Sequence, residues 1–126
     1  MAGMSANSGP GWKKHPTHRI VTTPVGGRVE VVLGGEVLAA SGKAVQLDED
    51  GYPSRYYLPR ADVRMDRLVR SSRRTYCPFK GHACYYSVIG GPENVAWSYE
   101  SPYDEMTAIK ELLAFYADKV NAIVIA

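Results

Sequence analysis

The stretch "RVEVVLGGEVLAAS", Arg28 to Ser41, decides the fold. Two runs rich in β-branched and aliphatic residues stand on either side of Gly34 and Gly35. Glycine adopts the positive φ angles of a two-residue hairpin turn without steric cost. The pattern therefore predicts two antiparallel strands joined by a tight Gly-Gly turn.

The same period of two continues on both sides of this hairpin. It predicts short strands over residues 19–23, 43–47 and 54–59, the last two around the acidic turn "DEDGYP". Residues 82–102 predict a second hairpin around a Gly-Gly-Pro turn. These spacings leave no room for the helices that connect parallel strands, so the sheets are expected to be antiparallel.

A single C-terminal helix is expected after the second hairpin. Ser101 and Pro102 provide an N-cap and a first-turn proline, and acidic residues follow in the first turn. Apolar residues then recur every three or four positions: Met106, Ile109, Leu113, Tyr116 and Val120. With "VNAIVIA" as a last strand, the predicted class is mainly β (α+β): compact antiparallel sheets with one C-terminal helix.

The first 16 residues differ from the rest in composition. They are rich in Gly, Ser, Pro and Lys and almost free of aliphatic residues, so we expect residues 1–16 to form a flexible tail. Residues 17–126 are then one β-rich domain, long enough to bury a core without disulfides. No apolar run approaches the roughly 20 residues of a membrane span, and no secretory signal is visible. A cytoplasmic protein with no membrane partner and with free thiols at Cys77 and Cys84 is expected.

Positive charge is concentrated in one part of the chain. The whole sequence has a net charge of +2, far from the strongly basic balance of a protein whose main partner is nucleic acid. From Arg55 to Lys80, however, seven arginines and one lysine face two aspartates, a net charge of +6. This run predicts a basic face; an interaction module using residues 64–74 is one alternative. RNA-binding sequence motifs are absent, which makes a nucleic-acid partner the less favoured interpretation.

The stretch "TYCPFKGHACYY", residues 75–86, contains both cysteines. Cys77, His82 and Cys84 form the pattern C-x4-H-x-C, but a structural zinc site usually has four ligands with one closely spaced cysteine pair. His15 and His18 are the remaining histidines, and no fourth ligand is evident. A buried strand cysteine and a surface histidine are favoured, and the sequence predicts neither a metal nor another cofactor.

The turn "CPFKG" places Lys80 three residues after Cys77. A cation and free backbone N–H groups near a thiol favour its thiolate form, so Cys77 and Lys80 are candidate catalytic residues. The alternative is that Cys77 packs as a small apolar side chain.

A pocket for an anion is the leading hypothesis. Arg60 and Lys80 are the predicted anion-binding groups, since guanidinium and ammonium groups pair with phosphates and carboxylates. Asp62 either orients Arg60 or caps the next turn. The predicted aromatic wall consists of Tyr57, Trp97 and Tyr99.

Several motifs resemble one known family. "HRI", "GGEVLAAS", "YYLPRADV", "TYCPFKGHACYYSV", "AWSYESP" and "LLAFYADKV" occur in the order and at the spacing of the bacterial family known as domain of unknown function 427. The resemblance covers about residues 18–120. That family is also labelled nucleotidyltransferase-like, although its activity is not established.

The resemblance implies a compact β-tent, in which two sheets meet at an angle with a helix alongside. The family pattern falls on Tyr57, Pro59, Arg60, Asp62, Thr75, Cys77, Pro78, Lys80, Gly81, Tyr85, Trp97, Tyr99 and Pro102. Many β-tent proteins bind zinc through paired C-x-x-C motifs, and this chain has none.

The nucleotidyltransferase label can be compared with the carboxylates that such chemistry needs. Metal-dependent nucleotidyl transfer usually uses two or three carboxylates to hold Mg²⁺. The candidates are Glu49, Asp62 and Glu100, and the D-x-D spacing of Asp48 and Asp50 falls in a predicted turn. The sequence thus predicts a small protein that binds a nucleotide or a carboxylate metabolite near Cys77 and Lys80. The alternatives are an enzyme with Cys77 as nucleophile, a nucleotidyltransferase-like enzyme and a basic interaction module; the oligomeric state is not predicted.

Overall fold

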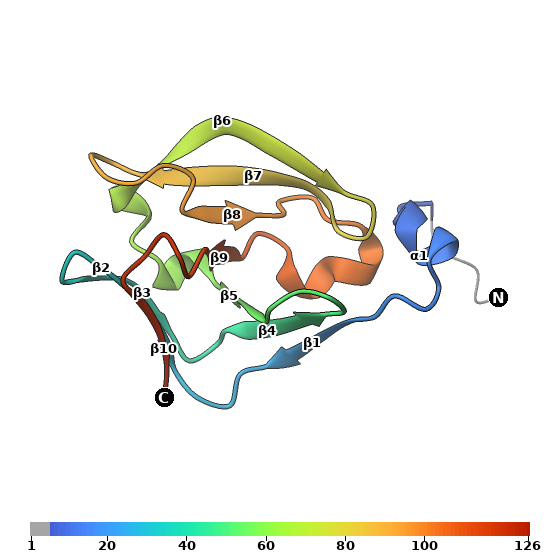
Figure 1. Cartoon of the computed structure of the whole chain (residues 1–126), viewed down its shortest axis with the longest axis horizontal. Coiled ribbons are helices and arrows are strands. Elements are labelled where there is room, and N and C mark those ends of the chain that lie inside the picture. Colours follow the sequence, from blue (N-terminus) through green and yellow to red (C-terminus); the bar gives the residue numbers. More distant parts are fainter. Residues whose placement is uncertain (1–5) are drawn as a thin grey trace.

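The computed structural model describes residues 6–126, which form two antiparallel sheets (Figure 1). The larger sheet contains, in spatial order, β1 (Ile20–Pro24), β4 (Val45–Glu49), β5 (Arg55–Leu58), β9 (Leu113–Phe115), β8 (Ala96–Ser98), β7 (Gly81–Val88) and β6 (Leu68–Cys77). The smaller sheet contains β10 (Ala122–Ile125), β2 (Val29–Leu33) and β3 (Glu36–Ser41). Every strand pair is antiparallel, so the mainly β, antiparallel class is confirmed.

The predicted hairpins are present. Gly34 and Gly35 have φ angles of 61° and 77° and connect β2 to β3, with Leu33 paired to Glu36. Two successive positive φ angles are what a tight hairpin turn requires. The pairs β4–β5 and β7–β8 and the last strand β10 also match the expectation.

The central strands of the larger sheet are buried on both faces. One face packs on the smaller sheet through an inter-sheet core that includes Val31, Leu58 and Tyr86. The other face, here called the outer face, has its own cluster, which includes Tyr57 and Tyr85. Neighbours such as Tyr85 and Tyr86 thus contribute to opposite faces, as the pleat of a strand requires.

The predicted C-terminal helix is wrong. Its first turns form only a short 3₁₀ segment, η3 (Asp104–Ile109), and Glu111 then has a φ of 63°, at which the chain turns back into the sheet. Residues 113–115 become β9 between β5 and β8. Leu113 and Phe115 enter the inter-sheet core, whereas Ala114 enters the outer face, so burial here has a period of two. The tent-like arrangement stays a prediction.

The structure also contains elements that the sequence did not predict. Residues 68–77 form β6, an edge strand whose side chains are mostly exposed and often charged. Because it is exposed, it lacks the alternating apolar residues by which a strand is predicted. Two further 3₁₀ segments are η1 (Arg60–Asp62) and η2 (Met65–Arg67). No helix within residues 6–126 has both the length and the apolar character needed to cross a membrane.

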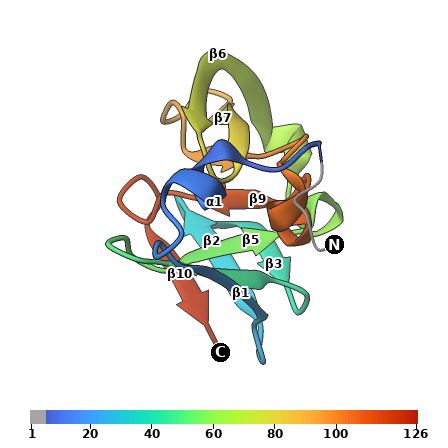
Figure 2. The same cartoon turned by 90° about the vertical axis from the view of Figure 1, so that its right-hand side faces the viewer.

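Part of the segment expected as a flexible tail has a defined place in the structure. Residues 1–5 lie outside the described residues, but α1 (Pro10–Lys14) packs beside the turn between β6 and β7, at the end of the molecule away from the smaller sheet (Figures 1 and 2). The Trp12 indole donates a hydrogen bond of 3.0 Å to the Phe79 carbonyl oxygen, and the two rings meet edge to face. The segment before β1 therefore contacts the turn that carries Lys80.

The position of β9 leads to a stability prediction. Leu113 has no exposed surface, so Leu113→Ala is expected to lower the free energy of unfolding by about 2–5 kcal/mol, as for other buried leucines. Val124→Ala, at a side chain 48% exposed, is the control and is expected to cost less than about 1 kcal/mol. Urea unfolding of both variants measures the difference. Equal small effects would contradict the placement of Leu113 in the core.

Candidate functional site

A cavity of about 350 Å³ opens on the outer face of the larger sheet. We call it the aromatic cavity, because six tyrosines and Trp97 line it. Much of its wall comes from alternate residues of five strands and of the position after β8: Leu47, Glu49, Arg55, Tyr57, Thr75, Cys77, Tyr85, Trp97 and Tyr99. Alternate residues share a face of a sheet, which is why these side chains converge.

The aromatic wall is tied together by its polar atoms. The Trp97 Nε1–H donates a 3.0 Å hydrogen bond to the Tyr57 hydroxyl across β9. Between them lies Ala114, which pairs with both residues and whose small side chain leaves room for the two rings to meet. The Trp97 and Tyr116 rings are in contact, with 4.4 Å between their centroids and an angle of 40° between their planes. The aromatic wall is therefore held in one arrangement.

The tyrosine hydroxyls of this wall remain neutral at physiological pH. Burial raises the pKa of Tyr57 and of Tyr99 well above the ordinary value of 10.0. Burial, with a hydrogen bond to Tyr85, raises the pKa of Tyr116 to about 12. Neutral phenols donate hydrogen bonds, and the Tyr99 hydroxyl has no hydrogen-bond partner among residues 6–126.

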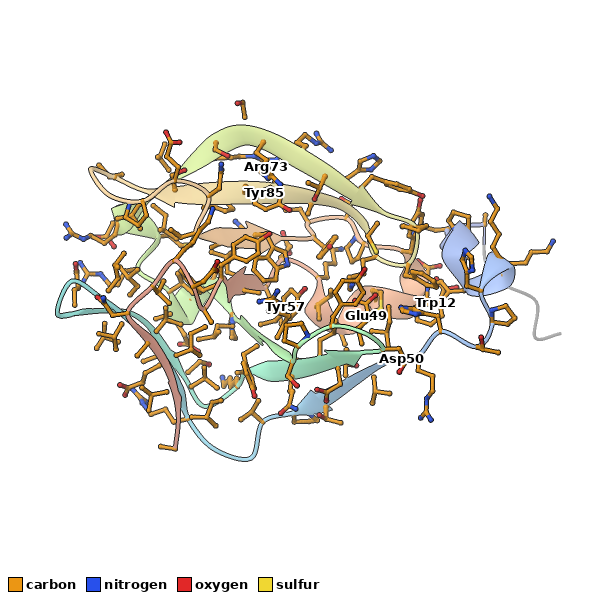
Figure 3. All side chains as sticks on the ribbon, in the orientation of Figure 1. Trp12, Glu49, Asp50, Tyr57, Arg73 and Tyr85 are labelled. Carbon is orange, nitrogen blue, oxygen red and sulfur yellow. The ribbon has the colours of Figure 1, made fainter. Side chains whose placement is uncertain are left out.

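One end of the cavity contains a buried ion pair. Lys80 Nζ lies 2.5 Å from Glu49 Oε1, and the two side chains are only 9% and 10% exposed. The second carboxylate oxygen of Glu49 lies 2.9 Å from His18 Nε2. Lys80 Nζ is also 3.9 Å from the Cys77 sulfur. Figure 3 shows Glu49 and Tyr57 between the upper strands β6 and β7 and the lower strands β4 and β1.

Arg55 supplies a second positive charge. Its guanidinium lies 5.3 Å from the centre of the Trp97 ring and 5.6 Å from that of Tyr116, in cation–π contact with both. It forms no ion pair with any carboxylate of residues 6–126. Because Lys80 is neutralised by Glu49, Arg55 is the cation of this wall that is open to an anionic ligand.

Arg60 lies away from this cavity, on the side of the sheet that carries Tyr86. Its guanidinium donates to the Tyr86 hydroxyl at 2.9 Å, to Ser98 Oγ at 3.0 Å and to Glu100 Oε2 at 3.0 Å. Its Nε donates to the Glu111 carbonyl oxygen at 2.7 Å. The predicted pairing of Arg60 with Lys80 around one anion does not fit this placement, because the donors of Arg60 are committed to the other side of the sheet.

Asp62 neither orients Arg60 nor lines the cavity. Its carboxylate accepts a 2.6 Å hydrogen bond from Ser41 Oγ on β3. Of the predicted residues, the structure therefore brings together Tyr57, Cys77, Lys80, Trp97 and Tyr99.

The structure also separates the residues considered as metal ligands. Cys84 is buried and donates to the Ser98 carbonyl oxygen at 3.5 Å, whereas Cys77 lines the aromatic cavity. The His82 ring contacts the Tyr76 ring at the surface, with 4.8 Å between their centroids. Within residues 6–126, no group of three or more His, Cys, Asp or Glu side chains is arranged to hold a metal ion.

The comparisons with known proteins agree with the sequence motifs. Residues 21–126 match the family labelled NTP_transf_9 and described as a domain of unknown function, DUF427. The chain belongs to this family. No curated protein matches the chain.

The basic run of this DUF427 protein is largely neutralised. Arg67 pairs with Glu36, and Arg64 pairs with Glu36 and Asp66. Arg70 pairs with Glu100 at 3.0 Å, whereas the exposed Arg74 forms no ion pair within the described part of the chain. Most of the run is therefore a surface network of ion pairs.

Sequence reasoning did not assign Arg55, Thr75, Tyr85 or Tyr116 to the candidate site, although Thr75 and Tyr85 fall on the family pattern, and it missed the pairing role of Glu49. A signal for two of them was available, because Arg55 and Thr75 stand two residues from the candidates Tyr57 and Cys77 on the same strands. Applying the two-residue period to each candidate would have added them. Tyr116 follows β9, where a helix was expected, so no such signal existed for it.

The ion pairs of Glu100 give the DUF427 domain a pH-dependent stability. Burial alone would raise the pKa of Glu100, but the charges of Arg70 and Arg60 and their hydrogen bonds outweigh it, so that the pKa is lowered from 4.5. A carboxyl whose pKa is lower in the folded state stabilises the fold above its unfolded pKa, and this contribution is lost as the pH falls through the folded pKa. We expect the wild type to lose stability below about pH 4.5 more steeply than Glu100→Gln does. Urea unfolding between pH 3 and 6 measures this, and parallel curves would contradict it.

Proposed function

We propose that this DUF427 protein binds a small organic anion in the aromatic cavity, with Arg55 as the charged contact. The observation that carries the proposal is the position of Arg55: a guanidinium on the cavity wall, fixed over two aromatic rings and without a carboxylate partner among residues 6–126. Such a group forms paired hydrogen bonds with a carboxylate or a phosphate.

The rest of the wall supports the same ligand chemistry. Pockets for small molecules are mostly apolar and aromatic with a few placed polar groups, and this cavity has that composition. The Tyr99 hydroxyl is a neutral donor without a partner in the described chain, suited to an oxygen of the ligand. Lys80 is paired with Glu49, so it orders one end of the cavity and adds little net charge.

Size favours a carboxylate metabolite over a nucleotide. Ligand pockets span about 300–1,000 Å³, and the aromatic cavity, at about 350 Å³, lies at the lower end. The three carboxylates considered for magnesium-dependent nucleotidyl transfer each have a different partner. Glu49 binds Lys80, Asp62 binds Ser41, and Glu100 binds two arginines. A small mono- or dicarboxylate is the preferred ligand class.

Thermal-shift screening of organic acids and nucleotides, followed by calorimetry, tests the proposal. Arg55→Ala is expected to weaken the best ligand at least tenfold, because it removes the ligand's only unpaired charged partner on the described wall. Arg74→Ala is the matched control, since it removes an unpaired arginine at a site outside the cavity, and a change of less than twofold is expected.

Two results would count against the proposal. One is a screen in which no organic anion raises the melting temperature. The other is an equal loss of affinity in Arg55→Ala and Arg74→Ala, which would indicate nonspecific attraction to a basic surface.

A further inference from the structure

The aromatic cavity contains a nucleophile that ligand binding does not use. Cys77 lines the cavity at the end of β6, with its sulfur 3.9 Å from Lys80 Nζ. The other cysteine, Cys84, is 4% exposed and hydrogen-bonded to backbone. Lys80 is paired with Glu49, so what this pair offers the thiol is a route for its proton, and a thiol that is open to a pocket beside such a pair is suited to nucleophilic attack.

Two phenols of the same cavity have hydroxyl protons without an acceptor among residues 6–126. Tyr99, 7% exposed, forms no side-chain hydrogen bond there, and Tyr57, 1% exposed, accepts from Trp97 but donates to nothing there. Burial raises the pKa of Tyr99, so its hydroxyl keeps the proton, and Tyr57, Cys77 and Tyr99 line the same cavity. No buried side-chain oxygen among the described residues lacks a hydrogen-bond partner, so the unpartnered Tyr99 hydroxyl is open to the cavity, where a ligand oxygen can accept from it.

A chain of polar contacts leads from the thiol to the surface. Cys77 Sγ contacts Lys80 Nζ at 3.9 Å, Lys80 contacts Glu49 Oε1 at 2.5 Å, and Glu49 Oε2 contacts His18 Nε2 at 2.9 Å. The His18 ring is held against Phe79, with 4.6 Å between ring centroids. In this series of contacts Glu49 is the base that takes the thiol proton through Lys80, and His18 orients the Glu49 carboxylate.

We propose that the aromatic cavity is an acyl-transfer site with Cys77 as nucleophile, Lys80 and Glu49 as proton carriers, and Tyr99 and Tyr57 as donors to the carbonyl oxygen. Its substrate class is an ester or thioester whose acyl group carries a second, ionised carboxylate. This inference rests on the proposed function, because Arg55 binds that carboxylate.

The first step of this reaction is acylation of Cys77. As the thiol proton moves to Lys80 Nζ, another proton moves from Nζ to Glu49. The sulfur lone pair forms a C–S bond to the carbonyl carbon, and the carbonyl π pair moves to the oxygen, which accepts hydrogen bonds from the phenols. When the C=O bond reforms, the bond to the alkoxide or thiolate leaving group breaks, and that group takes back the proton through Lys80.

The second step releases the acyl group. A water molecule, deprotonated by the same Lys80–Glu49 pair, attacks the acyl carbon, and Cys77 leaves as the thiol. The sum is one ester or thioester plus water giving one carboxylic acid plus one alcohol or thiol. No redox partner is required.

The test uses the full chain with Cys84→Ser, so that Cys77 is the single cysteine. The probe is the mono(4-nitrophenyl) ester of adipic acid, and 4-nitrophenyl hexanoate is its uncharged match. Mass spectrometry after acid quench is expected to find one adipyl group on Cys77, formed at least tenfold faster than in the urea-unfolded chain. No adduct at Cys77, or an adduct formed no faster than in urea, would overturn the proposal.

Tyr99→Phe separates a donor to the carbonyl oxygen from a structural role. It is expected to slow acylation about 10²-fold, the usual loss when one such donor is removed. Alkylation of Cys77 by iodoacetamide forms no oxyanion, so its rate is expected to change less than threefold. Equal slowing of both reactions would overturn the role of Tyr99. If circular dichroism shows that Tyr99→Phe does not fold, Tyr57→Phe is measured against the same two reagents.

His18 is a positioning residue, and its test is rescue. His18→Ala is expected to slow acylation about tenfold, while His18→Gln, which keeps a hydrogen-bond donor for Glu49, stays within threefold of the parent. Equal rates for both variants would remove His18 from the chain of contacts.

Failure of this inference is distinguishable from failure of the proposed function. Calorimetry with adipate on the Cys77→Ser variant reports binding without chemistry. Binding without acylation would leave the anion pocket standing and end the acyl-transfer proposal. The preference for the adipate ester over the hexanoate ester is expected to disappear in Arg55→Ala, and its persistence would show that Arg55 does not select the substrate.

Discussion

The alternation of side chains along the central strands of the larger sheet determines both the core and the cavity. A strand presents successive residues to opposite faces, and β5, β7, β8 and β9 are buried on both. Residues such as Tyr86 and Phe115 hold the smaller sheet, while Tyr57, Tyr85 and Trp97 face the other way. The core and the cavity wall thus take neighbouring positions of the same strands, and a shift of one residue in any strand pairing would exchange the two sets of side chains.

The ion pair of Lys80 and Glu49 has a different significance from that of the surface pairs. Removing two charges from water is costly, and a buried pair often contributes little to stability compared with apolar residues of the same size. Surface pairs such as Arg64 with Asp66 contribute little for another reason, because water screens them. A lysine 7% exposed beside a thiol is therefore better explained by the cavity than by stability.

The sequence correctly predicts those elements for which the local turn and strand preferences agree with the packing in the folded protein. The Gly34-Gly35 hairpin, the β7–β8 hairpin and the aromatic residues near Lys80 all followed from turn chemistry and alternation. The helix prediction failed at residues 104–116. Apolar side chains do recur there every three or four residues, but residues 113–115 pair with both β5 and β8 as a strand. The sequence also did not place Arg60, which lies two residues beyond the end of β5, in η1, where the alternation of a strand no longer applies.

The contacts of His18 and Trp12 place part of the candidate site outside the residues that match the family. The match begins at residue 21, whereas His18 contacts Glu49 and Trp12 contacts the turn that carries Lys80. The family match therefore begins at residue 21, whereas the residues in contact with the candidate site begin earlier in the chain. A recombinant fragment cut at residue 21 would keep almost every strand and lose the groups that hold the buried ion pair in place. Comparison of such a fragment with the full chain would separate what the fold needs from what the cavity needs.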